Sequence, residues 1–134
     1  MTATWRAFPV VTHVVDQRAI DTYAELSGDF NPLHVDPEYA AAGPFGSIVA
    51  HGPIALQTVF EAVTGWLGLE RIPPGVLIDV AYRGPVRVGD AITCTGGKPV
   101  DHAGALALQA RCVNQRDEEV LQALVVAPRA MVPR

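Results

Sequence analysis

Cysteine is scarce in this sequence, as are charged residues and long hydrophobic runs. The only two cysteines are Cys94 and Cys112; they are too few for a disulfide framework, and the lack of a CxxC pair excludes a zinc ribbon and a thioredoxin-type motif. We expect both to be small buried side chains in a reducing compartment. No apolar run reaches the roughly 18–20 residues of a membrane span, and the first residues lack the features of a signal peptide. These absences predict a cytoplasmic protein that is neither secreted nor inserted in a membrane.

Basic residues are few, with 10 Lys and Arg against 14 Asp and Glu, and the net charge is −4. Proteins that bind nucleic acid or anionic membranes carry basic patches, so we expect neither partner. Charged residues make up 18% of the chain and apolar residues 49%, which is typical neither of a disordered chain nor of a coiled coil. A length of 134 residues predicts one domain over residues 1–134, large enough to bury a core.

The sequence pattern changes near residue 72 from mostly helical to mostly extended. The expected elements, in chain order, are a strand at 8–15, helices at 16–26, 37–42 and 52–67, and strands at about 75–83, 89–97, 104–114 and 119–128. The helix at 52–67 is apolar nearly all round, so we expect it to be buried along most of its surface. The pattern predicts an α+β fold in which a curved antiparallel sheet wraps around a long central helix. Such a sheet has open edges, which favour pairing with another copy of the chain.

The segment at 27–36, SGDFNPLHVD, places two acids, an amide and an imidazole in a loop between two expected helices. Polar loops held between rigid elements often carry function. Asp29 and His34 are five residues apart, with a proline between them that stiffens the turn. A water held by both groups would suit general acid–base chemistry, since histidine titrates near neutral pH. The alternative is a purely structural role, in which Asp29 caps a turn and His34 is a structural histidine.

Metal binding is another chemistry that this region allows. His34, Asp36 and His51 are the available ligands, but they show no tight ligand spacing such as HExxH. Asp36 has a different role at hand, because it precedes Pro37 and can cap the helix that begins there. We therefore expect no metal site.

A second functional feature is the pair His51-Gly52, at the start of the long apolar helix. A helix N-terminus presents unpaired N–H groups and the positive end of the helix dipole. Glycine lets a ligand approach the backbone closely, so the N–H of Gly52 can serve as an oxyanion hole for a carbonyl group. The alternative is that Gly52-Pro53 merely begins the helix, since proline is favourable in a first turn.

Together these motifs resemble the MaoC-like family, which includes the (R)-specific enoyl-CoA hydratases and the hydroxyacyl-ACP dehydratases. The resemblance is carried by YAELSGDFNPLHVD at 23–36 and IVAHG at 48–52, which are similar to the family's G-D-x-N-P-x-H signature and its downstream H-G. The segment YRGPVRVGD at 82–90 is similar to the family's strand and turn around P-V-x-x-G-D. The resemblance covers nearly the whole chain and implies a single MaoC-like hot-dog domain.

The resemblance also implies a role for each matching residue. Asp29 and His34 match the catalytic pair, Asn31 and His51 match supporting positions, and the N–H of Gly52 matches the oxyanion donor. The implied activity is the reversible hydration of a trans-2-enoyl thioester of CoA, or of ACP, to the (3R)-hydroxyacyl thioester, without a cofactor. Since family members pair, we expect a homodimer or a higher homo-oligomer.

Two other functions remain open on the same fold. One is an acyl-CoA thioesterase, although the helix at 52–67 has no acidic residue near its start. The other is a thioester-binding subunit of a heteromeric hydratase. Subunits of that kind usually lose the catalytic pair, whereas this chain keeps Asp29 and His34.

Several further residues bear on the substrate. Those expected to contact it are Phe45, Gln57 and Arg83. The basic residues that can meet CoA phosphates at a rim are Arg83, Arg87 and Lys98. The helix face formed by Gln57, Phe60 and Glu61 is partly polar and bulky, which indicates a short or polar acyl group. Pro53 departs from the family pattern, because proline has no N–H and removes one donor next to Gly52.

Overall fold

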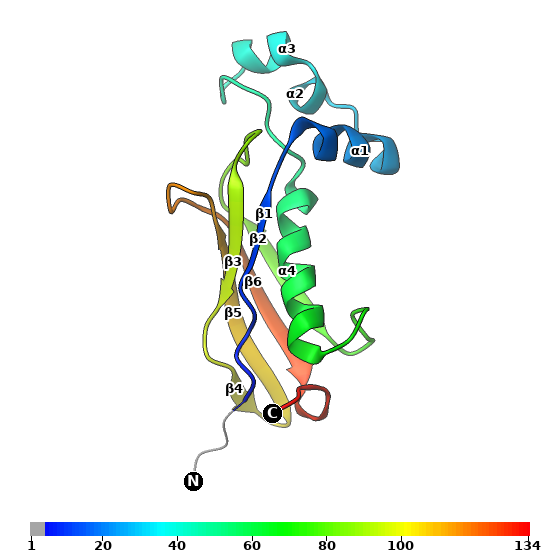
Figure 1. Ribbon diagram of the computed structural model, residues 1–134, viewed down its shortest axis with the longest axis vertical. Coiled ribbons are helices and arrows are strands. Elements are labelled where there is room, and N and C mark those ends of the chain that lie inside the picture. The colour runs from blue at the N-terminus through cyan, green and yellow to red at the C-terminus, as the bar shows by residue number, and fades with distance from the viewer. Residues whose placement is uncertain (1–4) are drawn as a thin grey trace.

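The computed structural model describes residues 5–134, so residues 1–4 of the expected domain lie outside the described residues. The elements, in chain order, are β1 (Val11–Val14), α1 (Gln17–Ser27), α2 (Pro32–Val35), α3 (Pro37–Ala42), α4 (Gly52–Leu67), β2 (Leu77–Tyr82), β3 (Ala91–Gly96), β4 (Val100–His102), β5 (Ala105–Val113), β6 (Glu119–Pro128) and the short 3₁₀ helix η1 (Arg129–Met131). Figure 1 shows α4 lying along one face of the sheet, with α1, α2 and α3 gathered at one end. No helix within residues 5–134 combines the length and the hydrophobicity that a membrane crossing requires.

The sheet is antiparallel throughout, with the strand order β1-β3-β5-β6-β2, and β4 pairs with β5 beside this path. The strands β1 and β2 are therefore the two ends of the sheet. The expected α+β layout, an antiparallel sheet wrapped around a long central helix, is confirmed. Edges of this kind present unpaired backbone groups.

The core forms between α4 and the sheet. Trp66, near the end of α4, is fully buried and packs edge-on against Phe8, with ring centroids 5.7 Å apart. The indole N–H of Trp66 donates to the carbonyl oxygen of Arg6 at 2.9 Å, so the polar atom of this large side chain is satisfied. Phe8 in turn covers Gly96 of β3 so closely that a Cβ there would lie 2.6 Å from the Phe8 ring. The chain before β1 is therefore locked between helix and sheet.

Both cysteines are free and fully buried, as expected. Cys94 of β3 and Cys112 of β5 lie directly opposite each other in the sheet, and the sulfur of Cys112 is 3.3 Å from the hydroxyl oxygen of Thr58 on α4. A hydrogen bond to Cys112, together with burial, raises the pKa of the Cys94 thiol far above its usual range. These groups belong to the packing between sheet and helix, and Cys94 stays a thiol.

Three local expectations were wrong. The strand expected at 8–15 is confined to Val11–Val14, because Pro9 has no N–H to pair with a neighbouring strand and packs against Gly65 instead. The segment at 27–36 is not one loop, since it contains the helix α2. The turn expected at 101–104 is shorter, because β4 takes up residues 100–102 and pairs with β5.

Candidate active site

The segment that carries Asp29 and His34 is held by a series of helix caps. Gly28 ends α1 in the left-handed conformation, with φ of 76°, which glycine adopts without strain. The side chain of Asn31 caps α2 by accepting a hydrogen bond from the N–H of Leu33 at 3.0 Å. Asp36 caps α3, as expected, and accepts hydrogen bonds from the N–H groups of Glu38 and Tyr39. Short helices with satisfied ends leave this segment little freedom.

His34 is held in one orientation by its backbone partner. Its Nδ1–H donates to the carbonyl oxygen of Val49, a bond that leaves Nε2 as the unprotonated nitrogen of the neutral ring. Nε2 faces the carboxylate oxygen Oδ2 of Asp29 at 3.9 Å. That distance is too long for a direct hydrogen bond, but one water can lie within hydrogen-bond distance of both atoms.

Asp29 is held by its own backbone and by His51. One carboxylate oxygen accepts from the N–H of Asn31 at 3.2 Å, while the carbonyl oxygen of Asp29 accepts from Nε2–H of His51 at 2.9 Å. The Asp29 side chain is half exposed, whereas the His34 side chain is 13% exposed. The Asp29 carboxylate is therefore accessible to solvent, whereas the His34 ring is largely buried.

His51 closes the buried side of the pair. It is 2% exposed and stacks on His34, with ring centroids 3.8 Å apart and an interplanar angle of 28°. The ring of Tyr23 also packs against His51, with centroids 4.7 Å apart and an interplanar angle of 52°. Within the described part of the chain, Nδ1 of His51 has no hydrogen-bond partner. His51 thus acts as a buried platform beneath His34 and as a donor to the backbone of Asp29.

The three side chains of Asp29, His34 and His51 lie close enough for a metal site, with their ligand atoms within 4.8 Å of one another. Their orientation disfavours one. Imidazole binds a metal along its nitrogen lone pair, which lies in the ring plane, and two nearly parallel rings 3.8 Å apart cannot both direct that lone pair at one ion. Asp36, named with the histidines as a possible ligand, uses Oδ1 to cap α3 instead. That the site holds no metal stays a prediction.

Gly52 is the first residue of α4, and its N–H makes no hydrogen bond within residues 5–134. Pro53 has no N–H, and the N–H of Ile54 donates to the carbonyl oxygen of His51 at 3.1 Å. Gly52, the first residue of α4, therefore carries a free donor at this helix start. The ring of Tyr82, at the end of β2, covers Gly52 so closely that a Cβ there would lie 2.7 Å from Cε1 and 2.9 Å from Cζ of the tyrosine.

Two hollows meet at Pro53, which lines both. One, of about 540 Å³, brings Phe45, Gly52 and Arg83 together. The other, of about 470 Å³, lies between α1, β1 and α4 and has Gln57 and Tyr23 in its wall. The three residues expected to contact substrate are thus divided between two hollows.

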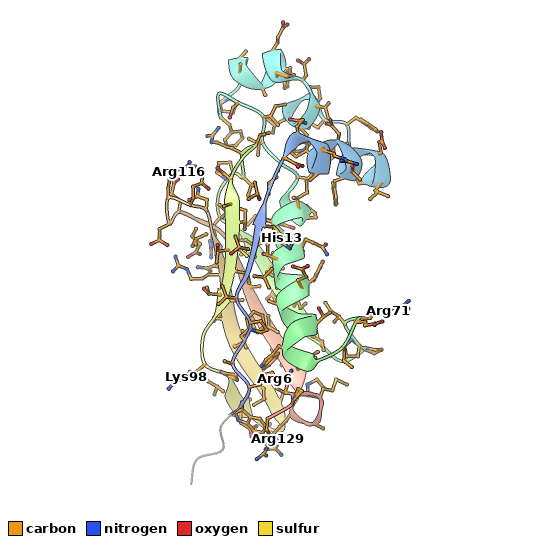
Figure 2. The ribbon with its side chains drawn as sticks, viewed as in Figure 1. Arg6, His13, Arg71, Lys98, Arg116 and Arg129 are labelled. Carbon is orange, nitrogen blue, oxygen red and sulfur yellow. The ribbon has the colours of Figure 1, made fainter. Side chains whose placement is uncertain are left out.

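Of the helix face expected to line an acyl tunnel, formed by Gln57, Phe60 and Glu61, only Gln57 lines a hollow. Neither Phe60 nor Glu61 lines either hollow, and Glu61 pairs with His13 of β1, which Figure 2 shows beside α4.

The basic residues expected to meet CoA phosphates do not form one cluster. Figure 2 places Lys98 near β4, at the end of the sheet away from α1 to α3, and Arg87 donates to the carbonyl oxygen of Phe45 and the hydroxyl of Ser47.

Sequence reasoning missed the two tyrosines, Tyr23 and Tyr82, as parts of this site. Burial and the nearby Tyr23 raise the pKa of the Tyr82 phenol above its usual value. The two tyrosines line different hollows, Tyr23 that of Gln57 and Tyr82 that of Gly52. Tyr23 begins the segment that resembled the family signature, which was the available signal for it. Tyr82 begins the second such segment, at 82–90, but its contact with Gly52 spans thirty residues of sequence and left no local signal.

Comparison with known proteins gives a consistent result. The sequence model of the MaoC like domain matches residues 6–118. The chain is 34% identical over 85 residues to an (R)-specific enoyl-CoA hydratase of Rhodospirillum rubrum, an alignment that covers 60% of this chain and 56% of that protein. It is 38% identical over 74 residues to a 3-hydroxybutyryl-CoA dehydratase of Methylorubrum extorquens, covering 52% and 44%. The chain thus spans about half the length of these curated relatives.

The fold is also found among solved structures. The R-hydratase PhaJ1 of Pseudomonas aeruginosa superposes with a TM-score of 0.76 at 23% identity, over 95% of this chain and 83% of that chain. At this identity the likeness concerns the fold. The expected hot-dog arrangement, a curved antiparallel sheet around one long helix, is confirmed.

Proposed function

The chain belongs to the MaoC-like domain family, and on this premise we propose that it is a hydro-lyase that hydrates a trans-2-enoyl thioester reversibly to the (3R)-hydroxyacyl thioester. The observation that carries the proposal is the pair formed by Nε2 of His34 and Oδ2 of Asp29, 3.9 Å apart. Both atoms are free acceptors that converge on one small volume at the start of α4. The carrier of the acyl group is CoA or ACP, as in proteins to which the chain is similar.

In the proposed reaction, Asp29 and His34 hold one water. One of the two takes a proton from the water as its oxygen bonds to C3 of the enoyl thioester. The electron pair of the C2–C3 double bond moves toward the thioester carbonyl, whose oxygen gains negative charge and is stabilised by the N–H of Gly52. A proton is then delivered to C2 on the same face, which completes addition of H and OH. Dehydration follows the same steps in reverse.

Asn31 and His51 position this pair in the proposed site. Asn31 caps α2, and His51 both supports the His34 ring and binds the backbone of Asp29. The thioester arm would lie in the hollow of Phe45 and Arg83, beside Gly52, and the acyl group would enter the hollow that contains Gln57.

The test is an assay of the purified chain on a panel of enoyl-CoA substrates, following loss of the enoyl absorbance and the chirality of the product. Asp29→Asn and His34→Ala are expected to lower the rate on the best substrate by about 10²–10⁴. Asp21→Asn and His102→Ala are matched controls. Asp21 is an exposed residue of α1, and His102 lies in β4, away from the site. Circular dichroism verifies folding. Near wild-type rates for both site variants would exclude the proposal.

The two alternatives give different results in the same experiment. A thioesterase releases free CoA thiol without loss of an enoyl absorbance, and a thiol-reactive dye detects it. A subunit of a heteromeric hydratase is inactive when purified alone.

We propose instead one domain over residues 1–134 that assembles with copies of itself, because β1 and β2 leave open sheet edges. Light scattering after size exclusion tests this, and a fully active monomer would contradict it.

A further inference from the structure

The helix start that carries Gly52 offers fewer backbone donors than an ordinary one. The first four N–H groups of an α-helix have no partner inside the helix. Here Pro53 removes one of them, and Ile54 donates its N–H to the carbonyl oxygen of His51. Within residues 5–134 this leaves the N–H groups of Gly52 and Ala55 unpaired, so the helix start has one donor fewer than usual, and a side chain could supply the missing hydrogen bond.

Tyr82 is the side chain placed to do so. Its ring lies over Gly52, and the positions nearest the glycine are Cε1 and Cζ, at 2.7 Å and 2.9 Å from where a Cβ would be. The third-nearest atom is Cδ1, at 3.2 Å, so one edge of the ring, which includes the carbon that carries the hydroxyl, lies against the start of α4. Tyr82 and Gly52 line the same hollow, and the Tyr82 side chain is half exposed.

We propose that the hydroxyl of Tyr82 is a catalytic hydrogen-bond donor to the thioester oxyanion, in the place of the amide hydrogen that Pro53 lacks. This inference rests on the proposed hydration at the same site. In this proposal Tyr82 and the N–H of Gly52 together stabilise the negative charge on the thioester oxygen. The hydroxyl donates a hydrogen bond and keeps its proton, so no further acid or base is required.

The surroundings of Tyr82 favour this role over that of a base. Burial and the neighbouring Tyr23 raise the pKa of the phenol, so the hydroxyl remains protonated at neutral pH and can donate. Arg83, the next residue, directs its guanidinium to the side chain of Gln122 at 3.2 Å. The phenol is therefore free to serve the hollow at Gly52.

The test is the Tyr82→Phe variant, which keeps the ring over Gly52 and removes the hydroxyl alone. An oxyanion donor acts in the transition state, so kcat should fall by about 10–100-fold while KM changes little. Tyr39→Phe is the matched control, because Tyr39 is an exposed tyrosine on α3 outside the hollow of Gly52; its kinetics should match the wild type.

A second variant separates a chemical role from a structural one. Pro53→Ala restores an N–H at the second position of α4, so the double variant Tyr82→Phe with Pro53→Ala should recover at least a few-fold in kcat over Tyr82→Phe alone. A merely structural tyrosine predicts no such rescue. An active wild type with an equally active Tyr82→Phe variant, or a double variant that shows no recovery, overturns the inference and leaves the hydratase proposal intact. A wild-type chain inactive on every enoyl thioester overturns both.

Discussion

The imidazole ring of His51 lies against that of His34, with centroids 3.8 Å apart, and its Nε2–H donates to the carbonyl oxygen of Asp29. One buried side chain therefore contacts both members of the proposed catalytic pair. Two further neighbours of His51 belong to the same site: Tyr23, whose ring packs against it, and Gly52, the next residue in the chain. The geometry of the pair thus depends on a residue that does not touch the proposed water.

The first prediction concerns His51. His51→Ala removes both the stacking surface and the donor, so we expect the hydration rate to fall at least about tenfold and the thermal midpoint to fall by about 5 °C. His51→Phe keeps a ring between Tyr23 and His34 but loses the hydrogen bond to Asp29. It should recover most of the stability and little of the rate. Thermal melts and initial rates measure the two effects, and unchanged kinetics in His51→Ala would contradict the role.

Asn31 gives a second prediction, because its side chain caps α2 through the N–H of Leu33. Asn31→Ala loses that cap, which typically costs about 0.5–2 kcal/mol, and His34 on the same short helix should be held less firmly. We expect a lower kcat and a lower midpoint in urea. Asn31→Asp keeps the acceptor oxygen and is the matched control for the cap. Equal stability of both variants would show that the cap does not matter.

Gly52 gives a third prediction. In Gly52→Ala the new methyl group would lie 2.7 Å from the Tyr82 ring, so the ring must move away. Tyr82 is half exposed and can turn outward, and we expect the variant to fold but to lose at least about tenfold in rate. Gly43→Ala is the control, since its methyl group would meet only ordinary contacts, the nearest at 3.4 Å. Steady-state kinetics decide, and a fully active Gly52→Ala variant would argue against this oxyanion site.

Gly96 and Gly97 provide a fourth, matched pair for stability. A methyl group at Gly96 would lie 2.6 Å from Phe8, which is itself packed against Trp66, so Phe8 has no free space to move into. We expect Gly96→Ala to lower the free energy of unfolding by about 1–3 kcal/mol. At Gly97 the nearest atom would be 3.7 Å away, and Gly97→Ala should be close to neutral. Urea denaturation compares them, and equal losses would refute the packing argument.

The fifth prediction concerns the thiols. Cys94 and Cys112 are fully buried, and the hydrogen bond between them raises the pKa of the Cys94 thiol and lowers that of the Cys112 thiol. Because thiolates are the reactive form, Cys94 is protected by its raised pKa and by burial, and Cys112 by burial. The folded protein should therefore not react with a thiol dye over minutes, whereas two thiols should react in denaturant. Rapid labelling of the native protein would contradict this. The result also decides whether dye assays for released CoA are free of background.

Local sequence was a good guide to several features of the site. The aspartate that begins α3, Asp36, acts on neighbours within a few residues, so its role as a helix cap follows from sequence spacing. The apolar pattern of residues 52–67 likewise predicted the buried central helix. The helix α2 and strand β4 escaped prediction because both are very short. Elements of that length form where tertiary contacts support them, and local propensity is a weak signal.

By itself, then, the sequence determined the fold class and the order and spacing of Asp29, His34 and Gly52, because these depend on periodicity and on short-range turns. Only the tertiary structure decided which groups surround them. His51 meets His34 because α4 begins beneath α2, and Tyr82 covers Gly52 because the end of β2 lies against that same helix start. Contacts between residues so far apart along the chain result from how the sheet wraps around α4, which no local pattern encodes.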